Sequence, residues 1–315
     1  MTDKYGVLKG ICISEKKGTK KHQVQEACLK ENWGIEGDAH AGNWHRQISL
    51  LSGEKIDAFR EKGAEVVYGD FGENMIVEGF DFRSLPVGTR FRIGEVILEM
   101  SQIGKECHSH CAIYQTMGDC IMPREGVFAV VKKGGTVRVG DRVECLGRDP
   151  EKALTAAVIT LSDKGYRGER EDKSGPAIVE ILTDKGYEII ETILLPDDRE
   201  KLEKELIRLS DQRQVNLIVT TGGTGFSPTD VTPEATMHVA TRNAPGIAEA
   251  IRAGSMAITR RAMLSREASV IRNQTLIVNL PGSPKAVRES LGFVIDQLDH
   301  GIRILTGLDS ECARK

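Results

Sequence analysis

The chain has 315 residues, 40% of them hydrophobic and 28% charged, with a formal net charge of −3 at pH 7. Its length predicts two domains, and its composition is that of a globular protein without the basic excess typical of nucleic-acid or anionic-membrane binding. Neither a transmembrane segment nor a signal peptide is recognisable, and the odd number of cysteines predicts reduced thiols in the cytoplasm.

Residues 1–148 are predicted to form a β-rich, barrel-like domain. A short run of strand-forming residues at 89–100 breaks at Gly94, and another lies at 143–146. The runs 127–131 and 136–139 flank a Lys-Lys-Gly-Gly sequence, which predicts a β-hairpin with a glycine-rich turn. A single helix is expected at 53–62. Several short strands with glycine-containing turns favour a barrel or a curled sheet.

A polar stretch with a proline at residues 147–152 is the expected boundary, and a second domain is predicted over residues 153–315. There, apolar strands and helices alternate, which predicts a mostly parallel α/β sandwich with helices on both faces. Strands are expected at 156–161, 188–195, 216–220 and 275–280. Helices are expected at 174–185, 199–212, 233–241, 246–259 and 284–305, with Ser174 and Thr232 as N-caps.

Polar and glycine-rich residues follow each predicted strand of the second domain. In an open α/β sheet, ligands bind beyond the carboxyl ends of the strands. One such end alone would be an ordinary turn, but the four together predict a binding site. The residues concerned are Ser162 and Asp163, then Asp197, then Thr221, Gly222, Gly223, Thr224 and Gly225, and finally Pro281 and Gly282.

The loop Thr221–Gly225 is the expected centre of this site. Its glycines allow backbone N–H groups to approach an anion, and its threonines add hydroxyl donors. It lacks the Gly-Lys-Ser/Thr of a Walker motif and the glycine spacing of a Rossmann motif. By itself, the loop predicts only an anion-binding turn.

Charged residues near this loop suggest nucleotide chemistry. Asp197 and Asp230 are candidates to hold Mg²⁺, which proteins bind through one or two carboxylates together with phosphate oxygens. Asp163 and Asp172 are weaker candidates for the same role. Phosphate-binding donors are expected from three further residues, Ser265, Arg266 and Lys285, although Lys285 is equally consistent with a surface position.

Several segments of the second domain share a specific pattern: Leu161-Ser162-Asp163, Asp172–Pro176, Pro196-Asp197, TTGGTGFSPTDVTPEAT (220–236), MLSREASVIR (263–272) and NLPGSPKAV (279–287). Together they closely resemble the molybdopterin adenylyltransferase (MoaB/Mog) family over nearly all of residues 153–307. The resemblance implies a homotrimer that transfers AMP from ATP to molybdopterin with Mg²⁺. It also implies catalytic and metal-binding roles for Asp197 and Asp230.

Two stretches of the first domain are rich in reactive side chains, namely GIEGDAHAG (34–42) and CHSHC (107–111). The second stretch lacks the spacing of a typical zinc site, which argues against a metal there. A nucleophilic or sulfur-carrying Cys107 beside histidines is chemically reasonable. Cys111 and Cys120 are expected to be structural thiols.

These stretches, with RQISLL (46–51), FGENMIVEG (71–79), LPVGTRFRIGEVILE (85–99) and GKECH (104–108), resemble the MOSC family over residues 5–146. The resemblance implies a β-rich domain that binds, carries or sulfurates the molybdenum cofactor, with Cys107 as the characteristic cysteine. The MOSC family is also associated with pyridoxal phosphate. The desulfurase half that uses this cofactor in molybdenum cofactor sulfurases is missing from the chain, so any sulfur would come from a partner.

The leading hypothesis is a bifunctional protein of molybdenum cofactor biosynthesis, in which an adenylyltransferase is fused to a cofactor-binding MOSC domain. Its expected partners are molybdopterin, ATP, a molybdate-insertion protein and a sulfur donor. The alternative is a molybdopterin or cofactor carrier without catalysis. A third hypothesis makes sulfur transfer through Cys107 the main activity.

Overall fold

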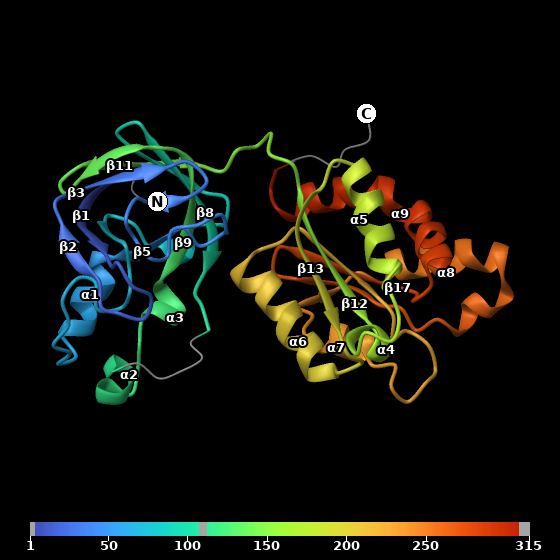
Figure 1. The fold of residues 1–315 in the computed structure, drawn as a ribbon. Coiled ribbons are helices and arrows are strands. Elements are labelled where there is room, and N and C mark those ends of the chain that lie inside the picture. The colour runs from blue at the N-terminus through green and yellow to red at the C-terminus, as the bar shows by residue number, and fades with distance from the viewer. Residues whose placement is uncertain (1–3, 107–111, 309–315) are drawn as a thin grey trace. The chain divides into compact units, whose positions relative to one another are not determined.

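The computed structural model describes residues 4–106 and 112–308 (Figure 1). The chain divides into two compact units, Met1–Asp149 and Pro150–Lys315, each with its own hydrophobic core. No helix among the described residues combines the length and the apolar composition needed to cross a membrane.

The N-terminal unit is a closed β-barrel. Its main sheet has the strand order β11-β7-β8-β9-β5-β6-β1-β2, and β11 also pairs with β1, which closes the ring. Among the described residues of this sheet, only β5 and β6 pair in parallel. The strands of this sheet are β1 (Tyr5–Ile13), β2 (His22–Val24), β5 (Ile48–Ser52), β6 (Met75–Glu78), β7 (Arg90–Ile93), β8 (Val96–Ile103), β9 (Val127–Lys133) and β11 (Arg142–Gly147).

Buried side chains of these strands fill the barrel, and Phe80, Phe82 and Phe91 form an aromatic cluster in its core. The ring centroids of Phe82 and Phe91 are 5.4 Å apart in an edge-to-face arrangement that favours aromatic packing. The unit also contains the helices α1 (Gly53–Arg60), α2 (Ala112–Met117) and α3 (Met122–Glu125), and a 3-10 turn at Phe82–Ser84. The β-rich, barrel-like fold predicted from the sequence is therefore confirmed.

The hairpin expected between residues 127 and 139 is wrong. The strand β10 (Gly135–Arg138) does not pair with β9 but with β3 (Glu26–Lys30), which also pairs with β4 (Gly34–Ile35) in a separate sheet. A Cβ at Gly134 would lie 2.5 Å from the carbonyl oxygen of Leu29. Glycine at this position thus lets the backbone pass close to Leu29. This close approach allows the chain to leave β9 in the main sheet and enter β10 in the smaller sheet.

The C-terminal unit contains a six-stranded sheet with the order β13-β12-β14-β17-β16-β15. The first four strands are parallel, and β16 and β15 extend the sheet antiparallel. This confirms the predicted α/β fold, although the short edge strands were not predicted. The strands are β12 (Thr155–Leu161), β13 (Glu188–Leu195), β14 (Leu217–Thr221), β15 (Arg242–Asn243), β16 (Ser269–Arg272) and β17 (Thr275–Leu280).

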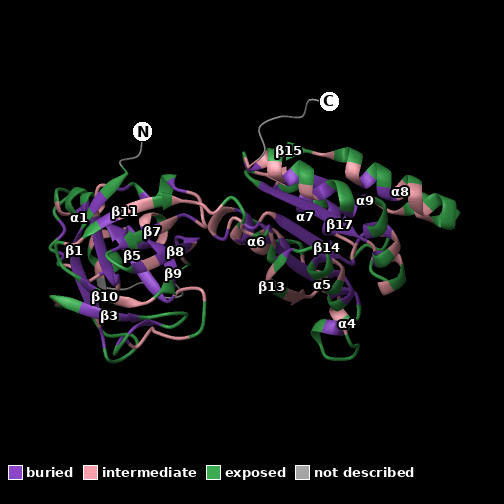
Figure 2. Ribbon diagram, turned by 90° about the horizontal axis from the view of Figure 1, so that it is seen from above, coloured by how far each residue is buried: buried purple, intermediate pink, exposed green. Residues whose placement is uncertain are grey.

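Helices cover both faces of this sheet (Figures 1 and 2). Alternate residues of each central strand pack against α5, α8 and α9 on one face and against α6 and α7 on the other. The central strands are consequently buried throughout. The helices are α4 (Asp163–Tyr166), α5 (Ser174–Asp184), α6 (Arg199–Ile207, continued by a π-helical turn at Arg208–Gln212), α7 (Thr232–His238), α8 (Pro245–Ile258, followed by a 3-10 helix at Arg260–Leu264) and α9 (Pro284–Leu305).

The two predicted N-caps are wrong, because both hydroxyls hold the neighbouring loops instead. Ser174 Oγ donates to the carbonyl oxygen of Gly282, while Asp172 accepts the N–H groups of Ser174 and Gly175 at the start of α5. Thr232 Oγ1 donates to the carbonyl oxygen of Gly222. Both side chains therefore tie a helix start to a loop at the carboxyl edge of the sheet.

Candidate active site

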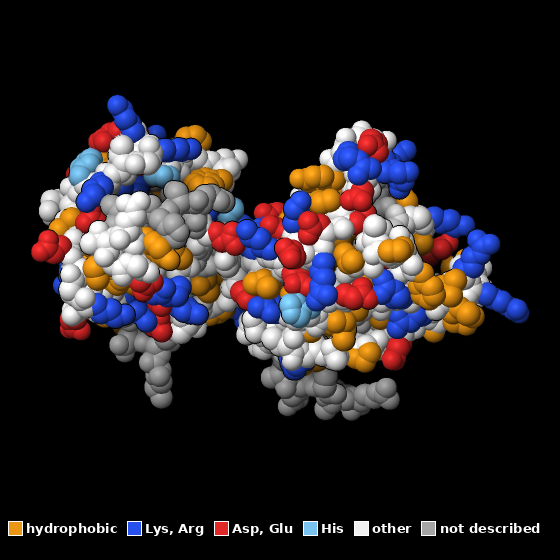
Figure 3. Space-filling view, turned by 90° about the horizontal axis from the view of Figure 1, so that it is seen from below, with side chains coloured by type: hydrophobic (Ala, Val, Ile, Leu, Met, Phe, Trp, Pro, Cys, Tyr) orange, Lys and Arg blue, Asp and Glu red, His pale blue; other side chains and the backbone are white. Residues whose placement is uncertain are grey.

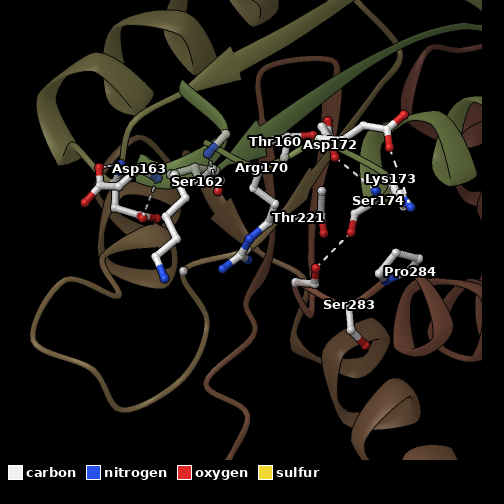
Figure 4. Close-up of a pocket in the computed structure, with 18 of the residues that line it drawn as sticks. Thr160, Ser162, Asp163, Arg170, Asp172, Lys173, Ser174, Thr221, Ser283 and Pro284 are labelled. Carbon is white, nitrogen blue, oxygen red and sulfur yellow. Dashed lines mark hydrogen bonds and ion pairs between the residues drawn. The ribbon is translucent and has the colours of Figure 1, made fainter. Parts of the chain in front are cut away.

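The carboxyl ends of β12, β13, β14 and β17 surround a cavity of about 800 Å³ in the C-terminal unit (Figure 4). Nine predicted site residues line it, namely Ser162, Asp163, Asp172, Asp197, Thr221, Gly222, Gly223, Asp230 and Gly282. Parallel strands bring their carboxyl ends to one edge of the sheet, which is why residues so distant in sequence meet here.

The loop Thr221–Gly225 is held tightly against its neighbours. Gly222 and Gly223 have φ angles of +96° and +63°, in the region that favours glycine. A Cβ at Gly222 would lie 2.3 Å from the carbonyl oxygen of Leu161, so no larger residue fits there without movement. Thr221 Oγ1 donates to the carbonyl oxygen of Pro281 at 2.7 Å. The loop is thus fixed to both adjacent strand ends.

Three carboxylates gather beside this loop. Asp163 and Asp197 exchange hydrogen bonds, since each side chain accepts the backbone N–H of the other, at 3.0 and 3.1 Å. Burial, together with the charges of Asp163 and Asp230, raises the pKa of Asp197. A Cβ at Gly225 would lie 2.8 Å from Asp230 Oδ2, which also accepts the N–H of Ser227. The site therefore concentrates negative charge against the glycine loop.

A divalent cation fits this arrangement. Among the described residues, Asp163, Asp197 and Asp230 form no ion pair with lysine or arginine. The N–H of Asp163 that Asp197 accepts only partly offsets the burial and the neighbouring negative charges, because the pKa of Asp197 is still raised. Carboxylate oxygens are ligands that Mg²⁺ accepts. Within residues 4–106 and 112–308, no group of three or more His, Cys, Asp or Glu side chains could hold a metal. The described residues therefore supply no complete set of metal ligands by themselves.

A second cavity of about 500 Å³ adjoins the first, and Gly223, Asp230 and Gly282 line both. The predicted residues Thr224, Gly225, Ser265 and Pro281 line this second cavity. Its wall includes Glu267, which is 5% exposed and whose Oε2 has no hydrogen-bond partner in the described part of the chain. Burial raises the pKa of Glu267. The glycine loop and Asp230 thus stand between two spaces.

Two cations expected to bind phosphate lie elsewhere. Arg266 lines neither cavity, and its guanidinium donates to the carbonyl oxygens of Gly225 and Asp230 and pairs with Glu234. It therefore holds the glycine loop and the Asp230 segment together. Lys285 lies on α9 with its side chain 85% exposed, and it lines neither cavity.

The cations that do line the larger cavity were not among the predicted site residues. They come from the loop after β12, which supplies Lys164, Arg170 and Lys173. Figure 4 shows the Arg170 side chain directed into the cavity. The available signal was the position of this charged loop directly after a strand at the edge that binds ligands. On the face shown in Figure 3, charges of both signs intermingle.

In the barrel, the stretch 34–42 contributes Asp38 to a buried ion pair and His40 beside it. Lys21 and Asp38 have side chains 2% and 1% exposed, and Asp38 also accepts the N–H groups of Ser14 and His40. His40 Nδ1 lies 3.4 Å from Lys21 Nζ. Burial, and then the charge of Lys21, lowers the pKa of His40. The predicted Cys107 and Cys111 lie outside the described residues, and Cys120 is buried.

The two units match different families of known proteins. Residues 157–300 match a probable molybdopterin-binding domain. A molybdopterin adenylyltransferase of Helicobacter pylori (strain 26695) is 40% identical over 158 residues, which are 50% of this chain and 90% of that protein. The chain belongs to the molybdopterin adenylyltransferase family. The Escherichia coli K12 member of the family is 42% identical over 146 residues, which are 45% of this chain and 74% of that protein.

The family relation covers the C-terminal unit, and residues 37–144 match the MOSC domain. Both resemblances seen in the sequence are thereby confirmed, and they place the chain in molybdenum cofactor biosynthesis. Among solved structures, the molybdopterin biosynthesis enzyme MoaB of Thermus thermophilus is 43% identical and covers 49% of this chain and 97% of its own, with a TM-score of 0.47.

Proposed function

We propose that the C-terminal unit transfers AMP from ATP to molybdopterin in a Mg²⁺-dependent reaction. The observation that carries this proposal is the placement of Asp197 and Asp230 against a glycine loop between two adjoining cavities. A transferase for two substrates needs two binding spaces that meet at the reacting atoms. The activity printed for the relatives in H. pylori and E. coli supports the same assignment.

The two cavities suit the two substrates by their chemistry. The larger one carries carboxylates together with the cations Lys164, Arg170 and Lys173, which suits a triphosphate with its metal. The smaller one combines apolar residues such as Leu264 with the buried carboxyl of Glu267. A carboxyl group in such a wall can accept hydrogen bonds from the N–H edge of a pterin ring. Both substrates would bring their phosphates to the shared glycine loop.

The reaction then requires positioning more than covalent chemistry by the protein. An oxygen of the molybdopterin phosphate attacks the α-phosphorus of ATP, and the bond from this phosphorus to the β-phosphate oxygen breaks. The electron pair leaves with pyrophosphate. Asp197 and Asp230 would hold Mg²⁺, which supplies neutralisation of phosphate charge. Backbone N–H groups of Gly222–Gly225 would orient the phosphates.

Incubation of the full chain with molybdopterin, ATP and Mg²⁺ tests this proposal. We expect release of pyrophosphate and a product heavier than molybdopterin by one adenylyl group, detected by mass spectrometry. Binding of molybdopterin without pyrophosphate release would instead establish the carrier function. A chain lacking only catalysis, such as the Asp230→Asn variant, is the matched control.

For the barrel unit, we propose binding of the molybdenum cofactor, with Cys107 as a sulfur-carrying or cofactor-contacting residue. The MOSC match supports a ligand site in this unit. Replacing Cys107 with Ser should reduce activation of a cofactor-dependent enzyme while leaving pyrophosphate release unchanged. Unchanged activation would remove Cys107 from the function.

The full proposal includes a homotrimer in the cytoplasm that works with a molybdate-insertion protein and a sulfur donor. Its support is the resemblance of both units to their families. Gel filtration with light scattering would measure the oligomeric state directly.

A further inference from the structure

The loop between β12 and α5 carries cations that the proposed reaction has not yet used. Both ends of this loop are anchored: Ser162 Oγ accepts the N–H of Gly165, and Asp172 Oδ1 accepts those of Ser174 and Gly175. Between these anchors, residues 166–171 are exposed. The loop is thus an exposed arm with anchored ends on the rim of the larger cavity.

Within this arm, the charges are paired unevenly. Arg167 makes two hydrogen bonds to Glu169, at 2.8 and 3.2 Å, and Lys173 lies 3.5 Å from Glu171. Arg170 forms no ion pair with any carboxylate in the described part of the chain, although it lies among these acidic neighbours. Arg170 lines the cavity, whereas Arg167 does not.

The Arg170 side chain points into the cavity, as expected for a residue that lines it. In Figure 4, its guanidinium extends from the arm into the cavity that Thr221 and Ser283 also line. A guanidinium presents several N–H donors in a planar fork that matches phosphate oxygens. Lys164 also lines the cavity, but it lies near Glu169, whose pKa is lowered chiefly by the hydrogen bond from Arg167 and to a smaller extent by the charge of Lys164. Arg170 is therefore the cation best placed to meet a polyphosphate.

We propose that Arg170 binds the β- and γ-phosphates of ATP and stabilises the pyrophosphate that leaves. This inference rests on the proposed adenylyl transfer. When the bond between the α-phosphorus and the β-phosphate oxygen breaks, negative charge develops on that oxygen, on the side away from the attacking phosphate. The carboxylates near the glycine loop cannot neutralise this charge, and a guanidinium can.

The test compares the full chain with the Arg170→Ala variant, using magnesium pyrophosphate and AMP as calorimetric probes. We expect pyrophosphate affinity to fall about 10- to 100-fold, as for loss of a charge-assisted hydrogen bond. AMP lacks the β- and γ-phosphates, so its affinity should change by less than about twofold. The Arg170→Lys variant keeps the charge but loses the planar fork of donors. Its affinity for pyrophosphate should therefore lie between those of the wild type and the Arg170→Ala variant.

The matched control is Arg167→Ala, because Arg167 lies on the same exposed arm but faces Glu169. This variant should bind both probes like the wild type. Equal pyrophosphate affinity in the Arg170→Ala and Arg167→Ala variants would overturn the proposal. An equal loss of AMP affinity in Arg170→Ala would also overturn it, because Arg170 would then hold the α-phosphate.

Kinetics separate this proposal from the proposed function. In the adenylyl-transfer assay, Arg170→Ala should lower kcat/KM for ATP about 10- to 100-fold and leave KM for molybdopterin unchanged. If the wild type released no pyrophosphate while Arg170→Ala still lost pyrophosphate affinity, the transferase function would fail and the polyphosphate site would stand. Normal turnover in the Arg170→Ala variant would refute the role of Arg170 but leave the proposed transferase function intact.

Discussion

Asp38 in the barrel and Asp197 in the α/β unit both lie in loops rich in glycine and charge, but their surroundings differ. Asp38 is fully buried, pairs with Lys21 and accepts two backbone N–H groups, and these contacts lower its pKa. Asp197 is partly buried, has Asp163 and Asp230 as charged neighbours, and its pKa is raised. One carboxylate is neutralised by the fold, and the other is not.

This difference distinguishes a structural carboxylate from one that awaits a ligand. A buried charge is stable only when paired, so the fold supplies the partner of Asp38 itself. Around Asp197, the fold supplies backbone contacts and further negative charge, and a bound cation would relieve the repulsion. Stability should therefore depend on the barrel pair, and activity on the carboxylates of the α/β unit.

The largest effect is expected on catalysis. Asp230→Asn keeps the shape of the side chain but removes the charge beside the glycine loop, so adenylyl transfer should fall about 1,000-fold or more. Pterin binding should remain largely intact, as measured by fluorescence titration. Turnover at the wild-type rate in this variant would show that activity does not depend on the charge of Asp230.

The next largest effect is expected on stability, when the buried ion pair of the barrel is broken. Lys21→Met leaves Asp38 buried without its partner, which should lower the free energy of unfolding by about 3–5 kcal/mol in denaturant titrations. Adding Asp38→Asn to this variant should recover part of the loss, because the unpaired charge disappears. A Lys21→Met protein as stable as the wild type would show that the pair is not structural.

A smaller change should follow from crowding Asp230 without changing its charge. Gly225→Ala places a Cβ 2.8 Å from Asp230 Oδ2 at a residue that does not have a positive φ angle. We expect adenylyl transfer to fall about tenfold, since displacement of a reacting group by an ångström is costly, while thermal unfolding changes little. Gly246→Ala, where nothing lies within 4 Å, is the matched control. Equal activity of both variants would contradict the placement of Asp230 at the reacting atoms.

The smallest effect concerns pH. Because the pKa of Asp197 is raised in the folded state, that state binds more protons, and its stability declines as pH rises from about 3.9 through the folded pKa. Asp197→Asn should therefore be more stable than the wild type at neutral pH, and the difference should vanish in acid. Denaturant titrations at several pH values measure this difference. A difference that grows toward acid would mean that Asp197 is stabilised in its charged form.

The sequence predicted most of the α/β unit because its periodic segments are long. The predicted bounds of β13 and α9 match the structure, and the four strand ends indeed meet at one edge. In the barrel, the apolar runs correctly predicted strands, but they did not predict which strands pair. Local turn residues suggested that β9 and β10 pair, whereas tertiary packing joins β10 to β3.

Side-chain roles at the site were harder to predict. Arg266 and Arg170 are both arginines in loops near the glycine loop, and only the fold shows that the first holds backbone carbonyl groups while the second faces the cavity. Similarly, Ser174 and Thr232 precede or begin helices, as N-caps do, but donate to loop carbonyl groups instead. Such partners are distant in sequence and leave no local pattern.

The most direct test of the account is the formation of adenylylated molybdopterin as a function of Mg²⁺ concentration, for the wild type and Asp197→Asn. We predict that the wild type forms product only with Mg²⁺ and that its rate saturates as the Mg²⁺ concentration rises. The Asp197→Asn variant should form almost no product at any Mg²⁺ concentration. Product formation by the wild type in excess chelator, or by Asp197→Asn at the wild-type rate, would contradict it.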